Sequence, residues 1–182
     1  MNRKETVVLV LILMAAFGAV VGYLQTRSDP PRGTAPPFFY EIEATDIVSV
    51  RVEQGGMAES FVWDEEAEEW RFDDEVGESV DEERWGGMPV LLAGPRIERT
   101  LPDGLELDAL GLEPPMASVI IGLEPSGEFR VLIGRRTPDG SAHYVKQSNN
   151  DTVFLVNAAW GDVISRLVTE PPRVVEADSD TP

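Results

Sequence analysis

The chain has 182 residues and a formal net charge of −18 at pH 7, and it contains no cysteine. Without cysteine, the sequence offers no disulfide, no thiolate nucleophile and no cysteine-ligated metal site. The negative charge repels phosphate backbones, so no nucleic-acid partner is expected.

An uncharged apolar stretch, residues 6–24, follows a short tail at residues 1–5. As a helix that rises about 1.5 Å per residue, it would cover roughly 28 Å, close to the hydrocarbon thickness of a bilayer. A cleaved signal peptide is the alternative, but its apolar core is usually about 7–15 residues long, and the small-x-small site that ends at Gly22 is poor. We therefore expect one uncleaved transmembrane helix. Gly18 and Gly22 have the G-x-x-x-G spacing that permits close contact with other transmembrane helices.

The charges beside this stretch are balanced, because Arg3 and Lys4 precede it and Arg27 and Arg32 follow it. The positive-inside rule therefore leaves the orientation open. A short tail before a long apolar run is the usual layout of a signal anchor, and the α-amino group adds positive charge to the tail. We expect a bacterial inner-membrane protein with a cytoplasmic N-terminus and a domain on the periplasmic or extracellular side.

The rest of the chain divides into a linker, a domain and a tail. Residues 25–37 are rich in proline and predict a stiff linker, residues 38–170 predict one acidic domain, and residues 171–182 form a polar tail. Period-two alternation and turn signals such as Asp139-Gly140 predict eight strands in the domain. These strands cover residues 47–52, 60–64, 70–72, 96–101, 117–123, 128–134, 142–146 and 152–156.

Two helices are expected beside these strands. Ser79 and Glu82 have the spacing of a capping box and predict a helix that reaches Leu92. Two glycines and a proline inside this stretch indicate a kink or a late start. Asn157 is a natural N-cap for the second helix. The apolar face of that helix contains Trp160, Val163, Ile164 and Leu167.

The order of these elements predicts the α+β class, with antiparallel strand meanders and helices on one sheet face. Residues 47–93 contain three strands and a helix, and residues 117–167 contain four strands and a helix. We interpret this pattern as a degenerate two-fold repeat, although the identity between the two halves is negligible. The four tryptophans follow the expected core periodicities, and one of them could instead anchor an interface. They are Trp63, Trp70, Trp85 and Trp160.

The segment from residue 107 to residue 156 resembles a bacterial family of membrane-anchored proteins of unknown function. The matching features are Leu110-Gly111-Leu112-Glu113-x-Pro115, Ile133-Gly134, Tyr144-Val145 and the strand from Val153 to Val156. The strand with Trp70 and the helix near Trp85 also look like this family. Its members are often encoded beside gliding-motility-type ABC-transporter auxiliary proteins. The resemblance implies a membrane-associated role and brings no catalytic residues with it.

Few residues in the sequence could support catalysis. His143 is the only histidine and could act as a general base, but a lone strand histidine is more typical of a surface or edge position. Lys146 and Ser148 are spaced to share one strand face, as in a serine–lysine dyad, yet no G-x-S-x-G elbow or oxyanion-hole signature accompanies them. The sequence also has no P-loop or dinucleotide fingerprint. We expect no catalytic residues, no cofactor and no enzyme activity.

Carboxylates gather in short runs at residues 64–66, 68–69, 73–75 and 81–83. Calcium takes six to eight oxygen ligands, but no D-x-D-x-D-G loop with a trailing glutamate is present, so we expect solvated loops and no metal site. Arg135 and Arg136 form a basic pair in this acidic domain and are candidates for a partner interface.

These observations favour a non-catalytic, single-pass accessory or stabilising subunit of a larger bacterial membrane complex, either transporter-associated or part of a photosynthetic or respiratory assembly. Its expected partners are integral membrane protein subunits, contacted through both the transmembrane helix and the domain. The alternative is a membrane-tethered extracytoplasmic domain that binds a ligand or calcium.

Overall fold

The computed structural model describes residues 35–174, apart from residue 126. The chain divides into two units, Met1–Ala35 and Pro36–Pro182, and the second contains the folded domain. The transmembrane helix expected at residues 6–24, with Gly18 and Gly22, lies outside the described residues. Within the described part of the chain, no helix has both the length and the apolar character needed to cross a membrane.

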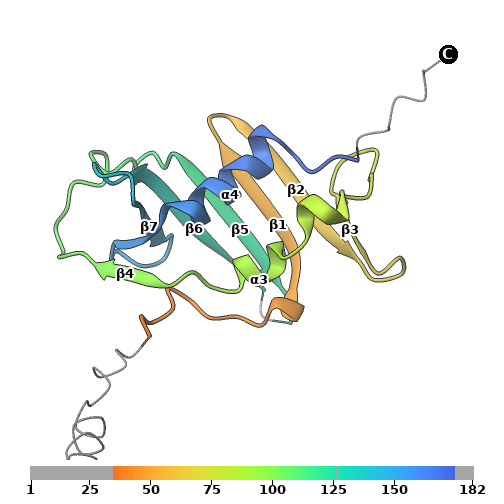
Figure 1. Cartoon of the computed structure of the whole chain (residues 1–182), viewed down its shortest axis with the longest axis horizontal. Coiled ribbons are helices and arrows are strands. Elements are labelled where there is room, and N and C mark those ends of the chain that lie inside the picture. The colour runs from red at the N-terminus through yellow and green to blue at the C-terminus, as the bar shows by residue number, and fades with distance from the viewer. Residues whose placement is uncertain (1–34, 126, 175–182) are drawn as a thin grey trace, which may run out of the picture. The chain divides into compact units, whose positions relative to one another are not determined.

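Eight strands of the described chain form an antiparallel sheet in the order β3-β2-β1-β5-β6-β7-β8-β4 (Figure 1). They are β1 (Ile47–Gln54), β2 (Met57–Asp64), β3 (Glu69–Phe72), β4 (Ile97–Thr100), β5 (Ala117–Leu123), β6 (Gly127–Arg136), β7 (Ala142–Gln147) and β8 (Phe154–Asn157). Two meanders run outward from the central β1–β5 pair, β1 to β3 toward one edge and β5 to β8 toward the other. β4 departs from this plan, because the chain crosses to the far edge and pairs there with β8.

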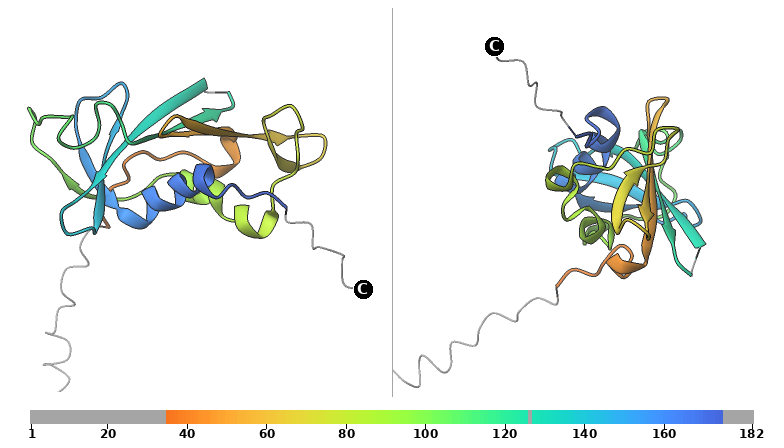
Figure 2. Two further views of the ribbon diagram at one scale, coloured as in Figure 1. Left: turned by 90° about the horizontal axis from the view of Figure 1, so that it is seen from above. Right: turned by 90° about the vertical axis from the view of Figure 1, so that its right-hand side faces the viewer.

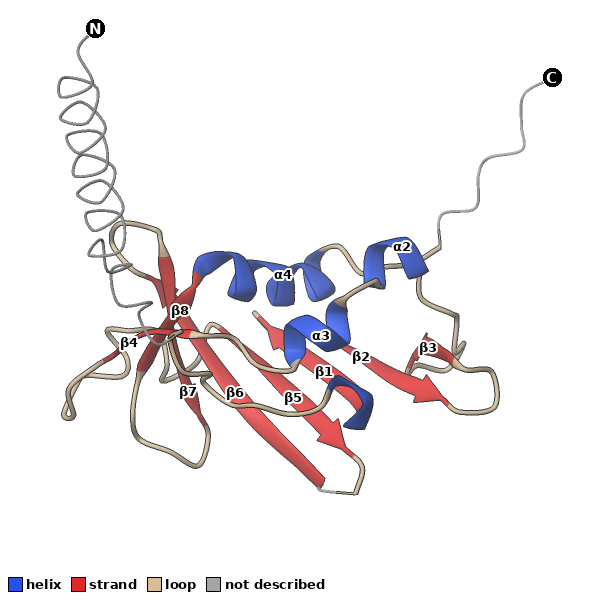
Figure 3. Cartoon of the chain, turned by 60° about the horizontal axis from the view of Figure 1, so that its bottom comes forward, coloured by secondary structure: helices blue, strands red, loops and turns tan. Residues whose placement is uncertain are grey.

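The helices are α2 (Glu82–Trp85), α3 (Met88–Leu92) and α4 (Ala158–Thr169), and a 3-10 turn, η1 (Ala44–Asp46), precedes β1. Figures 2 and 3 show α2, α3 and α4 on the same side of the sheet. The expected α+β class, with antiparallel strands and helices on one face, is therefore confirmed. The two-fold repeat remains a prediction.

β1 shows how the strand pattern produces this layered arrangement. Val50 and Val52 are almost completely buried under the helices, while Arg51 between them is exposed on the other side. Ile47 would face outward in a regular strand, yet it is also buried. A register shift between Ile47 and Ser49 turns its side chain into the core, as a β-bulge does.

The first helix differs from the expectation. Ser79 does not cap it; Ser79 bridges to Arg71 on β3 and donates its hydroxyl to Glu69. Asp81 is the cap instead, since its carboxylate accepts the backbone N–H groups of residues 83 and 84. The helix is then interrupted at Gly87, whose φ of 80° belongs to the left-handed region that glycine tolerates best. Two short helices therefore replace the single expected one.

The second helix agrees with the expectation. Asn157 caps it by accepting the N–H of Ala159 at 3.0 Å, and α4 lies across the sheet. Its buried face consists of Ala158, Trp160, Gly161, Ile164, Leu167 and Val168. Three of the four tryptophans are buried and Trp63 packs at the edge of the core, which confirms that they are mainly core residues.

Candidate functional site

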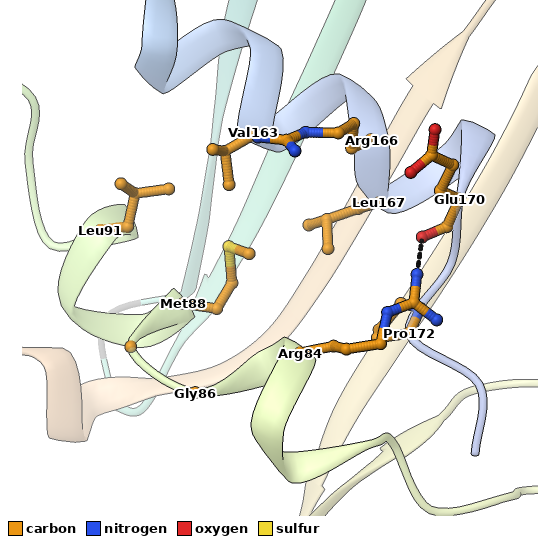
Figure 4. A pocket seen from close by; sticks show the side chains of 10 residues that line it. Arg84, Gly86, Met88, Leu91, Val163, Arg166, Leu167, Glu170 and Pro172 are labelled. Atoms are coloured by element: carbon orange, nitrogen blue, oxygen red, sulfur yellow. Dashed lines mark hydrogen bonds between the residues drawn. The ribbon is translucent and has the colours of Figure 1, made fainter. Parts of the chain in front are cut away.

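A groove lies between α4 and the α2–α3 pair, on the helical side of the sheet (Figure 4). Its volume is about 390 Å³. We call it the helix groove and define it by its lining residues. They are Arg84, Gly86, Gly87, Met88, Leu91, Val163, Arg166, Leu167, Glu170 and Pro172.

The floor of the helix groove is apolar and fixed. Met88 and Leu167 are buried, at 6% and 4% exposure, while Leu91 and Val163 are half-buried along the sides. The indole N–H of Trp160 donates to the carbonyl oxygen of Leu91 at 3.1 Å, which ties α4 to α3. The floor therefore belongs to the domain core and is preformed.

The chain that follows α4 closes one end of the helix groove. The carbonyl of Pro172 accepts the N–H of Asp81 at 2.8 Å, and Arg173 bridges to Val80. The guanidinium of Arg173 also stacks 4.1 Å from the ring centre of Phe72. These contacts hold Glu170 and Pro172 beside α2.

Two arginines border the apolar floor. Arg84 of α2 donates from Nη2 to the backbone carbonyl of Glu170 at 2.9 Å, and Arg166 of α4 extends along its helix beside Val163 (Figure 4). Among the described residues, no carboxylate lies within salt-bridge distance of either arginine. Three further described arginines, Arg96, Arg99 and Arg135, also lack such a partner, whereas five others pair with carboxylates. These five are Arg51, Arg71, Arg130, Arg136 and Arg173.

The helix groove is thus a positively charged, apolar site in a strongly acidic domain. Glu170 contributes one carboxylate at its end, so the two arginines leave a net positive charge. Such a site suits a group that combines an apolar body with an anion. It contains no pair of groups arranged as nucleophile and base.

His143 is not at the surface or at a sheet edge, so that expectation is wrong. β7 lies between β6 and β8, and the side chain of His143 is only 11% exposed. Its Nε2 lies 3.2 Å from Oδ1 of Asp162 on α4, and its Nδ1 lies 3.0 Å from the carbonyl oxygen of Gly134. α4 covers the ring closely, since a Cβ on Gly161 would lie 2.6 Å from Cδ2 of His143.

Asp162 receives a second partner from the sheet, because Arg136 of β6 forms an ion pair with it. This guanidinium is the main reason why the pKa of Asp162 lies below its usual range, and the bond from His143 adds to the effect. Each ring nitrogen of His143 lies within hydrogen-bond distance of an oxygen atom, and no hydroxyl among the described residues bonds to the ring. The cluster therefore fastens α4 to the sheet.

The remaining residues singled out from the sequence lie apart from one another. Nζ of Lys146, in a side chain only 8% exposed, lies 3.5 Å from Oδ1 of Asp151, and no hydrogen bond in the described chain joins it to Ser148. Arg135 is exposed and passes over Gly111. An interface role for Arg135 and Arg136 remains a prediction, with Arg136 already bound inside the domain.

Two of the acidic runs close their own turns. Asp64 accepts the N–H groups of residues 66 and 67, and Asp74 accepts those of residues 76 and 77. The N–H of Gly77 is the main cause of a lowered pKa at Asp74. Across the described ranges, no cluster of three or more histidine, aspartate or glutamate residues could hold a metal ion.

A larger pocket, about 630 Å³ in volume, lies elsewhere in the domain. Its walls include Leu101, Leu105 and Leu110 from the connection between β4 and β5, and Tyr144 and Leu155 from the sheet. Its charged residues are one arginine, Arg99, and two carboxylates, Glu98 and Asp139, so its lining carries a net negative charge. The helix groove is the more specific site because its charges and its buried floor point to one kind of ligand.

The sequence did not reveal the helix groove, because residues about 80 positions apart form it. One feature of the sequence does point to the helix groove. Val163, which is on the expected apolar face of α4, lies three residues before the charged Arg166 and therefore at the border of that face. A border position of this kind is where a helix can leave the core and line a surface groove.

Comparisons of the chain with protein-family models, curated proteins and solved structures gave no match. The resemblance to the bacterial membrane-anchored family therefore remains a prediction.

Proposed function

We propose that this protein is a non-catalytic, single-pass accessory or stabilising subunit of a larger bacterial membrane complex, and that its domain binds a partner subunit through the helix groove. The uncharged stretch at residues 6–24 supports a membrane anchor. Gly18 and Gly22 supply a candidate face for helix packing within the membrane. The proline-rich linker, residues 25–37, would hold the domain away from the headgroups.

The observation that carries this proposal is the pair of arginines at the helix groove. Arg84 and Arg166 differ from the other arginines without a carboxylate partner in the described chain because both line the same groove. They flank a preformed apolar floor. Arginines beside buried apolar side chains are typical of the anchoring regions of protein interfaces.

The alternative, a tethered ligand- or calcium-binding domain, has less support. Asp64 and Asp74 of the acidic runs accept hydrogen bonds within their own turns, and the larger pocket has a rim of mixed charge. An enzymatic function has still less support, because the described histidine and lysine are each paired with an aspartate.

The proposal can be tested by charge reversal at the helix groove. The full chain with a C-terminal tag is extracted from its own cells in a mild detergent, and the co-purifying membrane proteins are measured. We expect Arg166→Glu to lower their recovery by about tenfold, because charge reversal in a desolvated interface both removes an attraction and adds a repulsion. Arg99→Glu is the matched control, since Arg99 is also exposed and lacks a carboxylate partner among the described residues.

Equal loss of partners in both variants would show that the effect comes from net charge and not from the helix groove. Full recovery with Arg166→Glu would remove the helix groove from the proposal.

A further inference from the structure

We infer that the helix groove binds a partner segment in which an acidic residue stands next to a bulky apolar one. This inference rests on the proposed function and adds the chemistry of the occupant. The carboxylate would bind at Arg84 or Arg166, and the apolar side chain would lie on Met88 and Leu167.

The shape of the helix groove suits a side chain of this kind. About 390 Å³ lies between two helices that are tied together by the bond from Trp160 to Leu91, so the space does not depend on a rearrangement. This volume falls within the range of small binding pockets, which is roughly 300–1,000 Å³. Methionine adapts its shape to different apolar groups, and Met88 lies at the centre of the floor (Figure 4).

The charge of the helix groove favours an anionic group, and a carboxylate is the one that a protein segment supplies. Arg84 is held in position by its bond to the Glu170 carbonyl, and its other N–H groups remain available. A guanidinium presents two parallel donors that match the two oxygens of a carboxylate. Because Arg84 is already ordered, little side-chain entropy is lost when it binds.

The rest of the domain limits which partners can approach. The chain carries a net charge of −18, so a second copy or a densely anionic surface would be repelled. A partner surface that is basic around one acidic residue would be attracted by the negative charge of the domain, and its acidic residue would be attracted by the arginines of the helix groove. Residues 175–182 of this chain also contain carboxylates, and they are a competing occupant that the experiment must distinguish.

The experiment is site-specific photo-crosslinking in the native membrane. The full chain carries Val163→p-benzoylphenylalanine at the helix groove, and the cross-linked peptides are sequenced by mass spectrometry. The control is Val62→p-benzoylphenylalanine, which lies on β2 next to the buried Phe61 and therefore faces the opposite side of the sheet. Both variants are checked by circular dichroism for native folding.

We expect position 163 to cross-link a peptide of another protein in which aspartate or glutamate neighbours a bulky apolar residue. Adding Arg84→Gln and Arg166→Gln should lower this yield by at least about fivefold, while any cross-link at position 62 is unchanged. Both results together would support the inference.

Cross-links at position 163 only to lipid, to residues 175–182 or to a second copy would overturn the inference, as would a partner peptide without a carboxylate. The absence of any cross-link from a folded variant would do the same. If membrane proteins still co-purify with the tagged chain in that case, the accessory role stands and only the occupant is wrong. If they do not, the proposed function fails with it.

Discussion

Asp162 on α4 accepts hydrogen bonds from side chains on two neighbouring strands, Arg136 on β6 and His143 on β7. One carboxylate thus connects the longest helix of the described chain to the sheet. Because the cluster is partly exposed, solvent screens it, and we expect it to contribute at most about 1 kcal/mol to the free energy of unfolding.

The lowered pKa of Asp162 gives this contribution a definite pH dependence. Its ionised form is favoured by folding, so the stabilisation is complete above the usual aspartate pKa of about 4 and is lost as the pH falls through the lower value in the folded protein. We expect Asp162→Asn to lower the melting temperature at pH 7 by roughly 2–4 °C. The difference from the unmodified chain should shrink steadily below pH 4, as measured by circular dichroism.

Asp103→Asn, in the exposed connection after β4, is a suitable control for the loss of one negative charge. A melting-temperature difference for Asp162→Asn that is the same at pH 7 and at pH 2.5 would contradict this interpretation of the cluster.

α4 packs so closely on the sheet that one of its glycines has a structural reason. Replacing glycine with alanine inside a helix usually stabilises it by about 1 kcal/mol. At Gly161 the sign should reverse, because the new Cβ would lie 2.6 Å from a ring carbon of His143 that is held by hydrogen bonds on both sides. We expect Gly161→Ala to destabilise the domain by roughly 1–3 kcal/mol in urea unfolding.

The double variant Gly161→Ala with His143→Ala separates the close contact from the helix propensity. Relative to His143→Ala alone, the added alanine should then be neutral or stabilising. If Gly161→Ala is as costly without the histidine as with it, the ring is not the cause.

The elements themselves followed well from local sequence. Asn157 caps α4 as expected, and the Asp139-Gly140 turn leads into β7 as expected, because the contacts that form this cap and this turn are between neighbouring residues. The prediction that Ser79 caps the first helix failed because of contacts outside the local sequence. The hydroxyl and backbone of Ser79 are used by β3 across the sheet edge, so the cap moved to Asp81.

The pairing of elements could not be predicted in the same way. Nothing in the short β4 indicates that it crosses the domain to pair with β8. The environment of His143 was missed because Gly161, which lets α4 approach the ring, lies 18 residues further along the chain. The helix groove was missed for the same reason, since it needs α2, α3 and α4 to be placed side by side.

At the scale of the whole molecule, the net charge and the helix groove together limit which partners can bind. The strong negative charge of the chain disfavours self-association and anionic partners. In the helix groove of the described domain, two arginines without a carboxylate partner lie beside a buried apolar floor. A membrane anchor would add local concentration to this contact, so even a modest affinity in the groove would suffice for stable assembly.

Native mass measurement of the full tagged chain, released from its own membranes by a mild detergent, tests the accessory-subunit proposal most directly. We expect a defined complex in which one or a few copies of this chain accompany integral membrane proteins, with the same composition in repeated preparations. A spectrum that contains only the free monomer, under conditions that keep known membrane complexes of the same cells intact, would contradict the proposal.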